Sequence, residues 1–238
     1  MFNLGFDKRT LYIFLGIMLL INLMTGGMNL ATLVYSLPGV IIAMTFHEFA
    51  HAWMATKLGD DTPRLQGRLN LNPLSHTDPV GLLCLILVGF GWGKPVEINS
   101  RNFDRKYSLT KAEALVSIAG PLMNFLLAII FMISLFVMNM YVTTITTTIR
   151  VAITVIQSII LINISLGVFN LIPVYPLDGS KVLFHFLPYK GREWVMRNQT
   201  ILTMILFAVV LFTDIVPYIS FGIYNGIFSA LDFVFGLF

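Results

Sequence analysis

Charged side chains are scarce in this sequence. They make up 11% of its 238 residues, whereas hydrophobic residues make up 57% and the mean hydropathy is +0.83. Soluble domains carry about 25% charged residues, so this composition excludes a soluble fold and indicates a polytopic membrane protein. The net charge of +3 is accompanied by no nucleic-acid-binding motif, and we expect no nucleic-acid partner.

Cysteine is nearly absent as well. Cys84 is the only one, which excludes an intrachain disulfide and a metal site built from cysteines. No internal repeat, low-complexity tract or linker marks a second domain. We therefore expect one membrane-embedded domain over residues 1–238, with a core at about 30–180 and flanking spans at about 8–25 and 195–238.

Long apolar runs dominate what is present. A helix needs about 20 mostly apolar residues to cross the hydrocarbon core. The shorter run Gly81–Gly93 suits a re-entrant segment better than a full span. We expect an all-α polytopic membrane protein with about six transmembrane helices, and with the re-entrant segment and a small β-hairpin between spans 2 and 3. The six candidate spans are Leu11–Thr25, Leu30–Thr56, Ala112–Val142, Ile149–Ile172, Val195–Thr213 and Val216–Phe238.

The positions of lysine and arginine predict the orientation. With six spans, fourteen of the fifteen basic residues fall on one side of the membrane, and Arg150 is the exception. The positive-inside rule assigns that side to the cytosol. We therefore expect an integral protein of the cell membrane that has both termini in the cytosol and its active site towards the cytosolic side.

Inside the second apolar run lies the sequence HEFAH, residues 47–51. In a helix, His47 and His51 are one turn apart on one face, so both rings can reach one metal ion. Glu48 is placed to deprotonate a metal-bound water. A chance match, or two histidines satisfied in a helical core, is the alternative. Because ionisable side chains at membrane depth are costly and indicate a functional site by default, we favour a metal site.

A catalytic zinc usually takes three protein ligands, so the two histidines leave one ligand to find. Asp178 is the best candidate, because it follows the fourth run on a segment in which Pro173 and Pro176 prevent a regular helix. Non-helical backbone at membrane depth is tolerated where protein or a water-filled cavity surrounds it, so such a segment can fold back to the metal. An ordinary juxtamembrane loop with a solvated aspartate remains the alternative.

These segments together resemble the site-2 protease family of intramembrane zinc metalloproteases, in its compact type without a PDZ or CBS domain. HEFAH matches the family's HExxH motif, residues 170–179 match its NxxPxxxLDG motif, and residues 120–124 resemble its GPxxN motif. The resemblance covers about residues 45–180. Ser180 departs mildly from it, because many members carry a second glycine there.

The resemblance implies His47, His51 and Asp178 as the ligands of one Zn²⁺ per chain, with Glu48 as the catalytic residue. It implies hydrolysis of peptide bonds within or near transmembrane helices, known as regulated intramembrane proteolysis. The partner it implies is a transmembrane protein substrate in the lipid bilayer, typically single-span and cut beforehand by another protease.

Two asparagines and one histidine are further candidates. Asn124 and Asn170 either hydrogen-bond between helices, as amides in membranes commonly do, or donate to the carbonyl oxygen of the bound peptide. The resemblance favours a site role for Asn124, whereas Asn170 stays open between support of a ligand and substrate contact. His76 lies in the connecting loop, where we prefer a structural role to that of an extra zinc ligand.

Alternation of apolar and polar residues predicts two short strands, one over residues 65–71 and one over residues 96–99. An edge formed by Val96, Glu97 and Ile98 would pair with an unwound substrate and replace its lost helical hydrogen bonds. A plain hairpin that covers the site is the alternative.

Two other functions compete with this reading. The first is a membrane zinc protease of the prenyl-protein-processing type, which usually takes its third ligand from a Glu or His motif, so the Leu-Asp-Gly sequence at 177–179 argues against it. The second is a non-enzymatic metal transporter, which has little use for Glu48 between two ligands.

Overall fold

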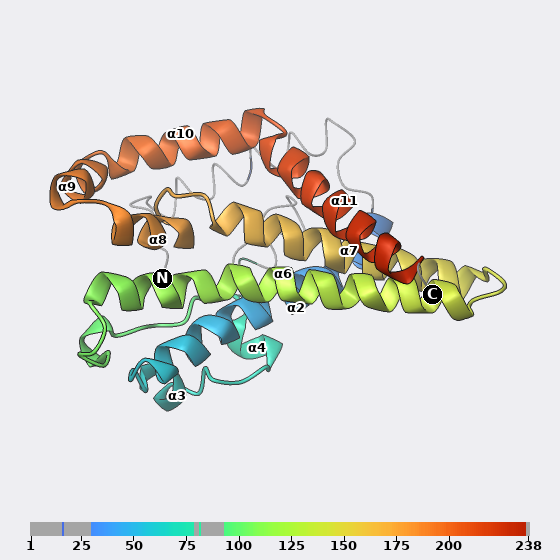
Figure 1. Ribbon diagram of the computed structural model, residues 1–238, viewed down its shortest axis with the longest axis horizontal. Helices are drawn as coiled ribbons and strands as arrows, with labels where there is room; N and C mark the ends of the chain where they lie inside the picture. Colours follow the sequence, from blue (N-terminus) through green and yellow to red (C-terminus); the bar gives the residue numbers. More distant parts are fainter. Residues whose placement is uncertain (1–15, 17–29, 79–80, 82–92, 237–238) are drawn as a thin grey trace.

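The computed structural model describes residues 16, 30–78, 81 and 93–236 (Figure 1). Most of these residues are helical, as predicted, and several of the helices are short connecting elements. In chain order the elements are α2 (Leu30–Lys57), α3 (Thr62–Leu65), α4 (Pro73–His76), η1 (Ser100–Asn102), α6 (Leu109–Tyr141), α7 (Thr147–Asn170), α8 (Asp178–Phe186), α9 (Tyr189–Arg197), α10 (Gln199–Phe212) and α11 (Ile215–Phe235).

Helices α2, α6 and α7 pack against one another and form the core (Figure 1). The connection between α6 and α7 is short, as is usual for antiparallel neighbours. Buried apolar side chains fill the contact between these two helices, among them Met132, Ile160 and Ile164. Helix α11 packs over the same cluster with Ile223 and Ile227. This core keeps the three long helices in fixed register, which any site built between them requires.

Four described helices are long and apolar enough to cross a membrane: Ala31–Lys57 within α2, then α6, α7 and α11. Large apolar side chains such as Leu126 and Ile130 are exposed on their outer faces. A helix satisfies its own backbone hydrogen bonds, so such faces suit a lipid environment. The protein is therefore an integral membrane protein.

The described residues do not confirm the predicted set of six spans. The first predicted span, Leu11–Thr25, and the re-entrant segment, Gly81–Gly93, lie outside the described residues except at single positions. The fifth, Val195–Thr213, is broken at Asn198 between α9 and α10. Helix α10 has 14 residues, a length of about 21 Å, which is shorter than the hydrocarbon core of about 30 Å.

The C-terminal end of α11 lies far from the basic end of the bundle. The ring of Phe235 stacks on Phe136 at a centroid distance of 5.3 Å, and Phe136 belongs to the last part of α6. The end of α11 therefore lies beside the last part of α6 (Figure 1), whereas Lys111 lies in the first turn of α6 and Lys57 at the C-terminal end of α2. The prediction of a cytosolic C-terminus is not confirmed: it counts Val195–Thr213 as a span, whereas α10 is too short for a complete crossing.

The predicted β-hairpin is also corrected within the described residues. Residues 62–65 form a short helix with a proline in its first turn, and residues 94–99 form no strand. The backbone N–H groups of Val96 and Asn99 donate to the carboxylates of Glu48 and Asp60 instead of to a neighbouring strand. The described part of the chain contains one antiparallel bridge, between Thr77 and Gly93.

Candidate metal centre

Helix α2 presents His47 and His51 on one buried face towards α6. Their ring centroids are 4.6 Å apart and both side chains are buried. Opposite them lies Gly120 of α6, where an added Cβ would stand 2.5 Å from His51 Nε2 and 2.7 Å from His47 Cε1. Only glycine allows the two helices to approach this closely, because any side chain would enter the space of the rings.

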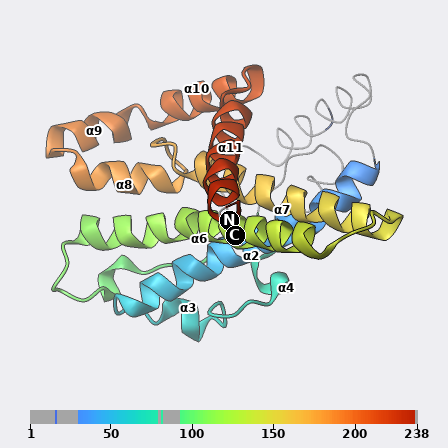
Figure 2. The same ribbon diagram turned by 45° about the vertical axis from the view of Figure 1, so that its right-hand side comes forward.

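The turn between α7 and α8 brings Asp178 back to this face. Pro173 and Pro176 end the helical path after α7, and α8 begins at Asp178. The turn is so tight that a Cβ at Gly179 would overlap the carbonyl oxygen of Leu171. In both views α8 lies alongside the first half of α6 (Figures 1 and 2). The turn therefore returns the chain to the histidines of α2.

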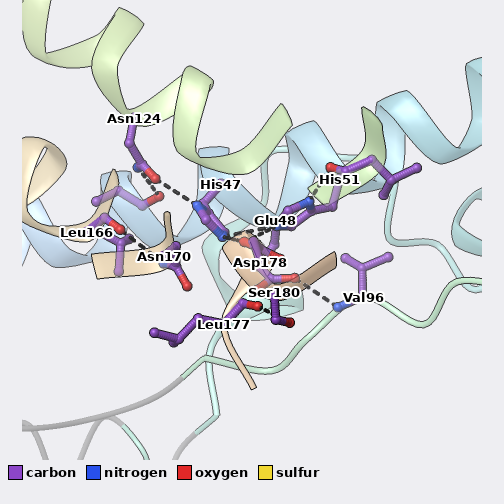
Figure 3. Close-up of polar contacts among 12 residues, drawn as sticks. His47, Glu48, His51, Val96, Asn124, Leu166, Asn170, Leu177, Asp178 and Ser180 are labelled. Atoms are coloured by element: carbon purple, nitrogen blue, oxygen red, sulfur yellow. Dashed lines mark hydrogen bonds and ion pairs between the residues drawn. The ribbon is translucent and has the colours of Figure 1, made fainter. Parts of the chain in front are cut away.

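Three ligand atoms converge at one point (Figure 3). Asp178 Oδ2 lies 3.1 Å from His47 Nε2 and 3.1 Å from His51 Nε2, and the two Nε2 atoms are 3.0 Å apart. Ligand atoms around a tetrahedral zinc, at about 2.0–2.2 Å from the ion, are roughly 3.3 Å from one another. The three residues thus fit one face of a zinc coordination shell.

Hydrogen bonds on the far side of each ring determine which nitrogen carries the proton. His47 Nδ1 lies 2.7 Å from Asn124 Oδ1, and His51 Nδ1 lies 2.8 Å from the carbonyl oxygen of Val116. A carbonyl oxygen only accepts, so each Nδ1 donates and each neutral ring keeps a lone pair on Nε2. Two lone pairs and a carboxylate oxygen within 3.1 Å repel one another unless a cation lies between them.

The carboxyl group of Asp178 is held in its ionised form, which is the form that binds metal. Burial alone would raise its pKa, but His51 and His47 carry positive charge when a proton takes the place of a metal ion on Nε2, and this charge lowers the pKa well below its usual range. Among the described residues, His47, His51 and Asp178 make the one group of three side chains able to hold a metal ion. His76 is not part of it, since its Nε2 bonds to the carbonyl oxygen of Asn70.

Glu48 lies beside the three ligand atoms (Figure 3). Its Oε2 accepts a hydrogen bond of 2.8 Å from the backbone N–H of Val96. This bond connects the base predicted on α2 to the segment 94–99, which runs past the site. The carboxyl group is half-buried, so it is accessible to a small molecule such as water.

The buried carboxylate of Asp60 holds the far end of segment 94–99. Burial opposes its ionisation, but hydrogen bonds from Thr62, Asn102 and the backbone of Asn99 outweigh burial and lower the pKa below its usual value of 3.8. The Asn99 N–H lies 2.7 Å from Asp60 Oδ2. The carboxylates of Glu48 and Asp60 therefore hold this segment at Val96 and at Asn99, while the Lys94 N–H at its start donates to the His76 carbonyl oxygen at 2.9 Å.

The two asparagines predicted from the sequence differ in burial and in hydrogen bonding. Asn124 is fully buried, and both hydrogens of its Nδ2 are used, towards the Ala43 carbonyl oxygen and Asn163 Oδ1, each at 3.0 Å. Asn170 is half-buried, and its Nδ2 donates to the Leu166 carbonyl oxygen at 3.1 Å. Asn163 was missed from the sequence, because a single amide in an apolar helix looks like ordinary interhelical hydrogen bonding.

Val96, Glu97 and Ile98 have three different surroundings. Val96 bonds to Glu48, as described above, and the exposed Glu97 accepts a hydrogen bond of 2.8 Å from Gln66 Nε2. Ile98 packs against a small buried cluster that includes Ala55 and Val116. The segment is thus held by backbone hydrogen bonds to carboxylates and by the side chains of Glu97 and Ile98, and its backbone forms no strand ladder with the described residues.

The chain was compared with known proteins. The family model described as "Peptidase family M50" matches residues 35–213. The chain is 37% identical over 197 residues to "Putative zinc metalloprotease YwhC" of Bacillus subtilis (strain 168), covering 82% of this chain and 88% of that protein. It is 33% identical over 97 residues to "Putative zinc metalloprotease Rip2" of Mycolicibacterium smegmatis, covering 40% and 37%. No solved structure matches.

Proposed function

The chain belongs to peptidase family M50 and is a zinc metalloprotease, and from this premise we propose that it hydrolyses peptide bonds within or near the transmembrane helices of membrane proteins. The observation that carries the proposal is the meeting of His47, His51 and Asp178 between long apolar helices. A hydrolytic site in that position acts on a bond that the bilayer presents. Regulated intramembrane proteolysis is the activity that fits.

Each residue of the site has one task. His47, His51 and Asp178 hold the zinc, which when bound supplies a Lewis acid that activates water and polarises the scissile carbonyl. Glu48 takes a proton from the attacking water and returns it to the leaving amine. The Val96 N–H keeps the Glu48 carboxylate in place during both transfers.

Asn170 is the better candidate for the substrate oxygen. An oxyanion role for Asn124, as predicted, would require it to give up its bond to Ala43 or to Asn163. Only one bond is formed by Asn170 Nδ2 within the described part of the chain, so its second hydrogen can donate to the substrate carbonyl as negative charge develops. We assign Asn124 to the orientation of His47 and Asn170 to substrate contact.

A transmembrane substrate must be unwound before a zinc site can cut it, because its backbone is hydrogen-bonded as a helix. The backbone N–H groups of Glu97 and Ile98 bond to no other described residue, and they lie next to the Val96–Glu48 contact. We propose that the unwound substrate pairs with Val96, Glu97 and Ile98. Proline at Ile98 removes one of these donors, so we expect slower cleavage with unchanged zinc content.

The membrane arrangement follows from the basic residues. We propose that the end of the bundle with Lys57, Lys111 and Lys181 faces the cytosol of the cell membrane, so that the active site opens to that side. The predicted span Leu11–Thr25 would then start from a cytosolic N-terminus. We further propose that residues 30–180 form the catalytic core, with α10 and α11 at its flank as the gate through which substrate enters.

A reconstituted system tests the function. The purified protein with zinc is mixed in proteoliposomes with a tagged single-span substrate, and mass spectrometry of the fragments locates the cut. We expect a bond inside the apolar span or at its edge. Cleavage confined to the soluble tail of the substrate would contradict intramembrane proteolysis, while zinc binding and peptidase chemistry would stand.

A further inference from the structure

A line of buried hydrogen bonds leads from α7 to the zinc ligand His47. Asn163 Nδ2 donates to the Ile159 carbonyl oxygen at 2.9 Å, and Asn163 Oδ1 accepts from Asn124 Nδ2 at 3.0 Å. Asn124 Oδ1 in turn accepts from His47 Nδ1 at 2.7 Å (Figure 3). Both asparagines have no exposed surface. Since no water competes for these groups, each bond constrains the next.

The direction of this line is fixed by its carbonyl ends. The Ile159 carbonyl oxygen can only accept, so the NH₂ group of Asn163 faces it and the oxygen of Asn163 faces Asn124. Asn124 must then turn its NH₂ group towards Asn163 and leave its oxygen to the ring of His47. Reversal of the Asn163 amide would set two oxygens against each other at Ile159 and two NH₂ groups against each other at Asn124.

The orientation of the Asn124 amide affects the metal site through His47. An oxygen opposite Nδ1 requires a proton on Nδ1 and leaves the lone pair on Nε2, which is the atom that faces Asp178 and His51. Groups that orient a ligating histidine in this way typically change metal affinity about 10- to 100-fold when they are removed. Asn163 shares the orientation of Asn124 with the Ala43 carbonyl oxygen, which accepts the other hydrogen of Asn124 Nδ2 at 3.0 Å and requires the same direction of the amide.

We propose that Asn163 is a positioning residue of the zinc centre, which fixes the amide of Asn124 so that His47 offers Nε2 to the ion. The inference rests on the proposed function only in taking zinc as the resident ion. It goes beyond that function because it assigns a role at the metal to a side chain that touches neither metal nor substrate.

The competing explanation is that Asn163 only holds α6 and α7 together. The two explanations predict different effects of an Asn163 substitution on zinc affinity. Asn163→Leu keeps the size of the side chain and removes the oxygen that accepts from Asn124. Asn163→Asp, protonated in this fully buried position, keeps an oxygen towards Asn124 and a hydroxyl that donates to the Ile159 carbonyl oxygen. Ile160→Ala serves as the matched control, because Ile160 is equally buried on the same helix and makes only apolar contacts.

The test measures the zinc dissociation constant of the full-length purified protein by competition with a chelator, without substrate. We expect Asn163→Leu to weaken zinc binding about 10- to 100-fold, and Asn163→Asp and Ile160→Ala to stay near wild type. In an Asn124→Ala background, Asn163→Leu should add no further loss, because the two residues act in series. If Asn163→Leu does not fold, Asn163→Ala replaces it against the same control.

Unchanged zinc affinity in the folded Asn163 variants would overturn the proposal. So would an equal loss in Ile160→Ala, since packing alone would then explain the effect. Because no substrate is present, failure of the proteolysis experiment and failure of this one are separate results.

Discussion

At the scale of single residues, the zinc centre depends on groups behind the ligands as much as on the ligands. The protons on Nδ1 of His47 and His51 are fixed by Asn124 and by the carbonyl oxygen of Val116. Gly120 leaves the room in which both rings approach α6. A substitution at any of these positions therefore acts on the metal without removing a ligand.

Gly120→Ala tests this argument. The new Cβ would lie 2.5 Å from His51 Nε2, too close for the ring to keep its place, so we expect loss of most bound zinc and of cleavage. Metal analysis of the purified protein measures it. Gly222→Ala is the control, because a Cβ there meets nothing within 4 Å and alanine favours a helix by about 1 kcal/mol. Full zinc content in Gly120→Ala would contradict this argument, because α6 could then shift without loss of bound zinc.

Single residues also show how much of the site could be predicted from the sequence. His47, His51 and Asp178 could be predicted because their spacing and the adjacent prolines are visible in the chain. Asn163 could not, because its role depends on which side chain of α6 it meets. The tasks of Asn124 and Asn170 also became distinguishable only when the direction of each amide bond was known.

At the scale of elements, segment 94–99 is held by carboxylates at Val96 and Asn99 and by one backbone hydrogen bond from Lys94 to His76, rather than by a strand ladder. Asp60 accepts from Thr62, Asn99 and Asn102, and it has no exposed surface. The length of the apolar runs predicted α2, α6 and α7 well. Alternation misled at 65–71, where the backbone turns and residues 66–68 donate to carbonyl oxygens of residues 62–64. It also misled at 96–99, where carboxylates accept from the extended backbone in place of a neighbouring strand.

Asp60→Asn should loosen this segment. An amide cannot accept all the hydrogen bonds that the carboxylate accepts, and a buried donor left unpaired costs about 1–3 kcal/mol. We expect faster hydrogen exchange over residues 96–102. Asp61→Asn provides the comparison, since Asp61 is exposed and pairs only with Arg64 on the surface. Equal exchange in both variants would argue that Asp60 does not hold the segment.

Asp60 also predicts a pH dependence. Its pKa is lowered in the folded protein, so its stabilising effect is present above the ordinary value of 3.8 and is lost as the pH falls through the lower folded pKa. Wild type should therefore show increasing hydrogen exchange over residues 96–102 below about pH 4, and Asp60→Asn should lack that step. A step of the same size in the variant would assign the effect to another group.

At the scale of the whole molecule, the bundle has a basic end with the zinc centre and an opposite end with the α6–α7 connection. Composition and charge predicted a membrane protein with the site near one face. They did not predict that α10 is too short to cross, because its apolar run continues into α9 without a visible break in hydropathy. Because α10 supplies no complete crossing, we propose that α11 ends on the side of the membrane opposite to the one predicted from six spans.

Single cysteines report this arrangement. In a Cys84→Ser background, Thr144→Cys in the α6–α7 connection and Asp232→Cys near the end of α11 should react with an impermeant thiol reagent from the same side of the membrane. Lys190→Cys in α9 should react from the other side. If Asp232→Cys and Lys190→Cys react from the same side of the membrane, the result contradicts this arrangement and supports six spans.

The central claim is that one zinc centre, with Glu48 as its base, cuts peptide bonds at the membrane. Measuring zinc content and cleavage of a tagged single-span substrate together, in wild type and Glu48→Gln, tests it most directly. Glu193→Gln, on the exposed face of α9, controls for loss of a carboxylate elsewhere. We predict full zinc content in all three and cleavage abolished in Glu48→Gln alone. Equal cleavage by wild type and Glu48→Gln would contradict the mechanism.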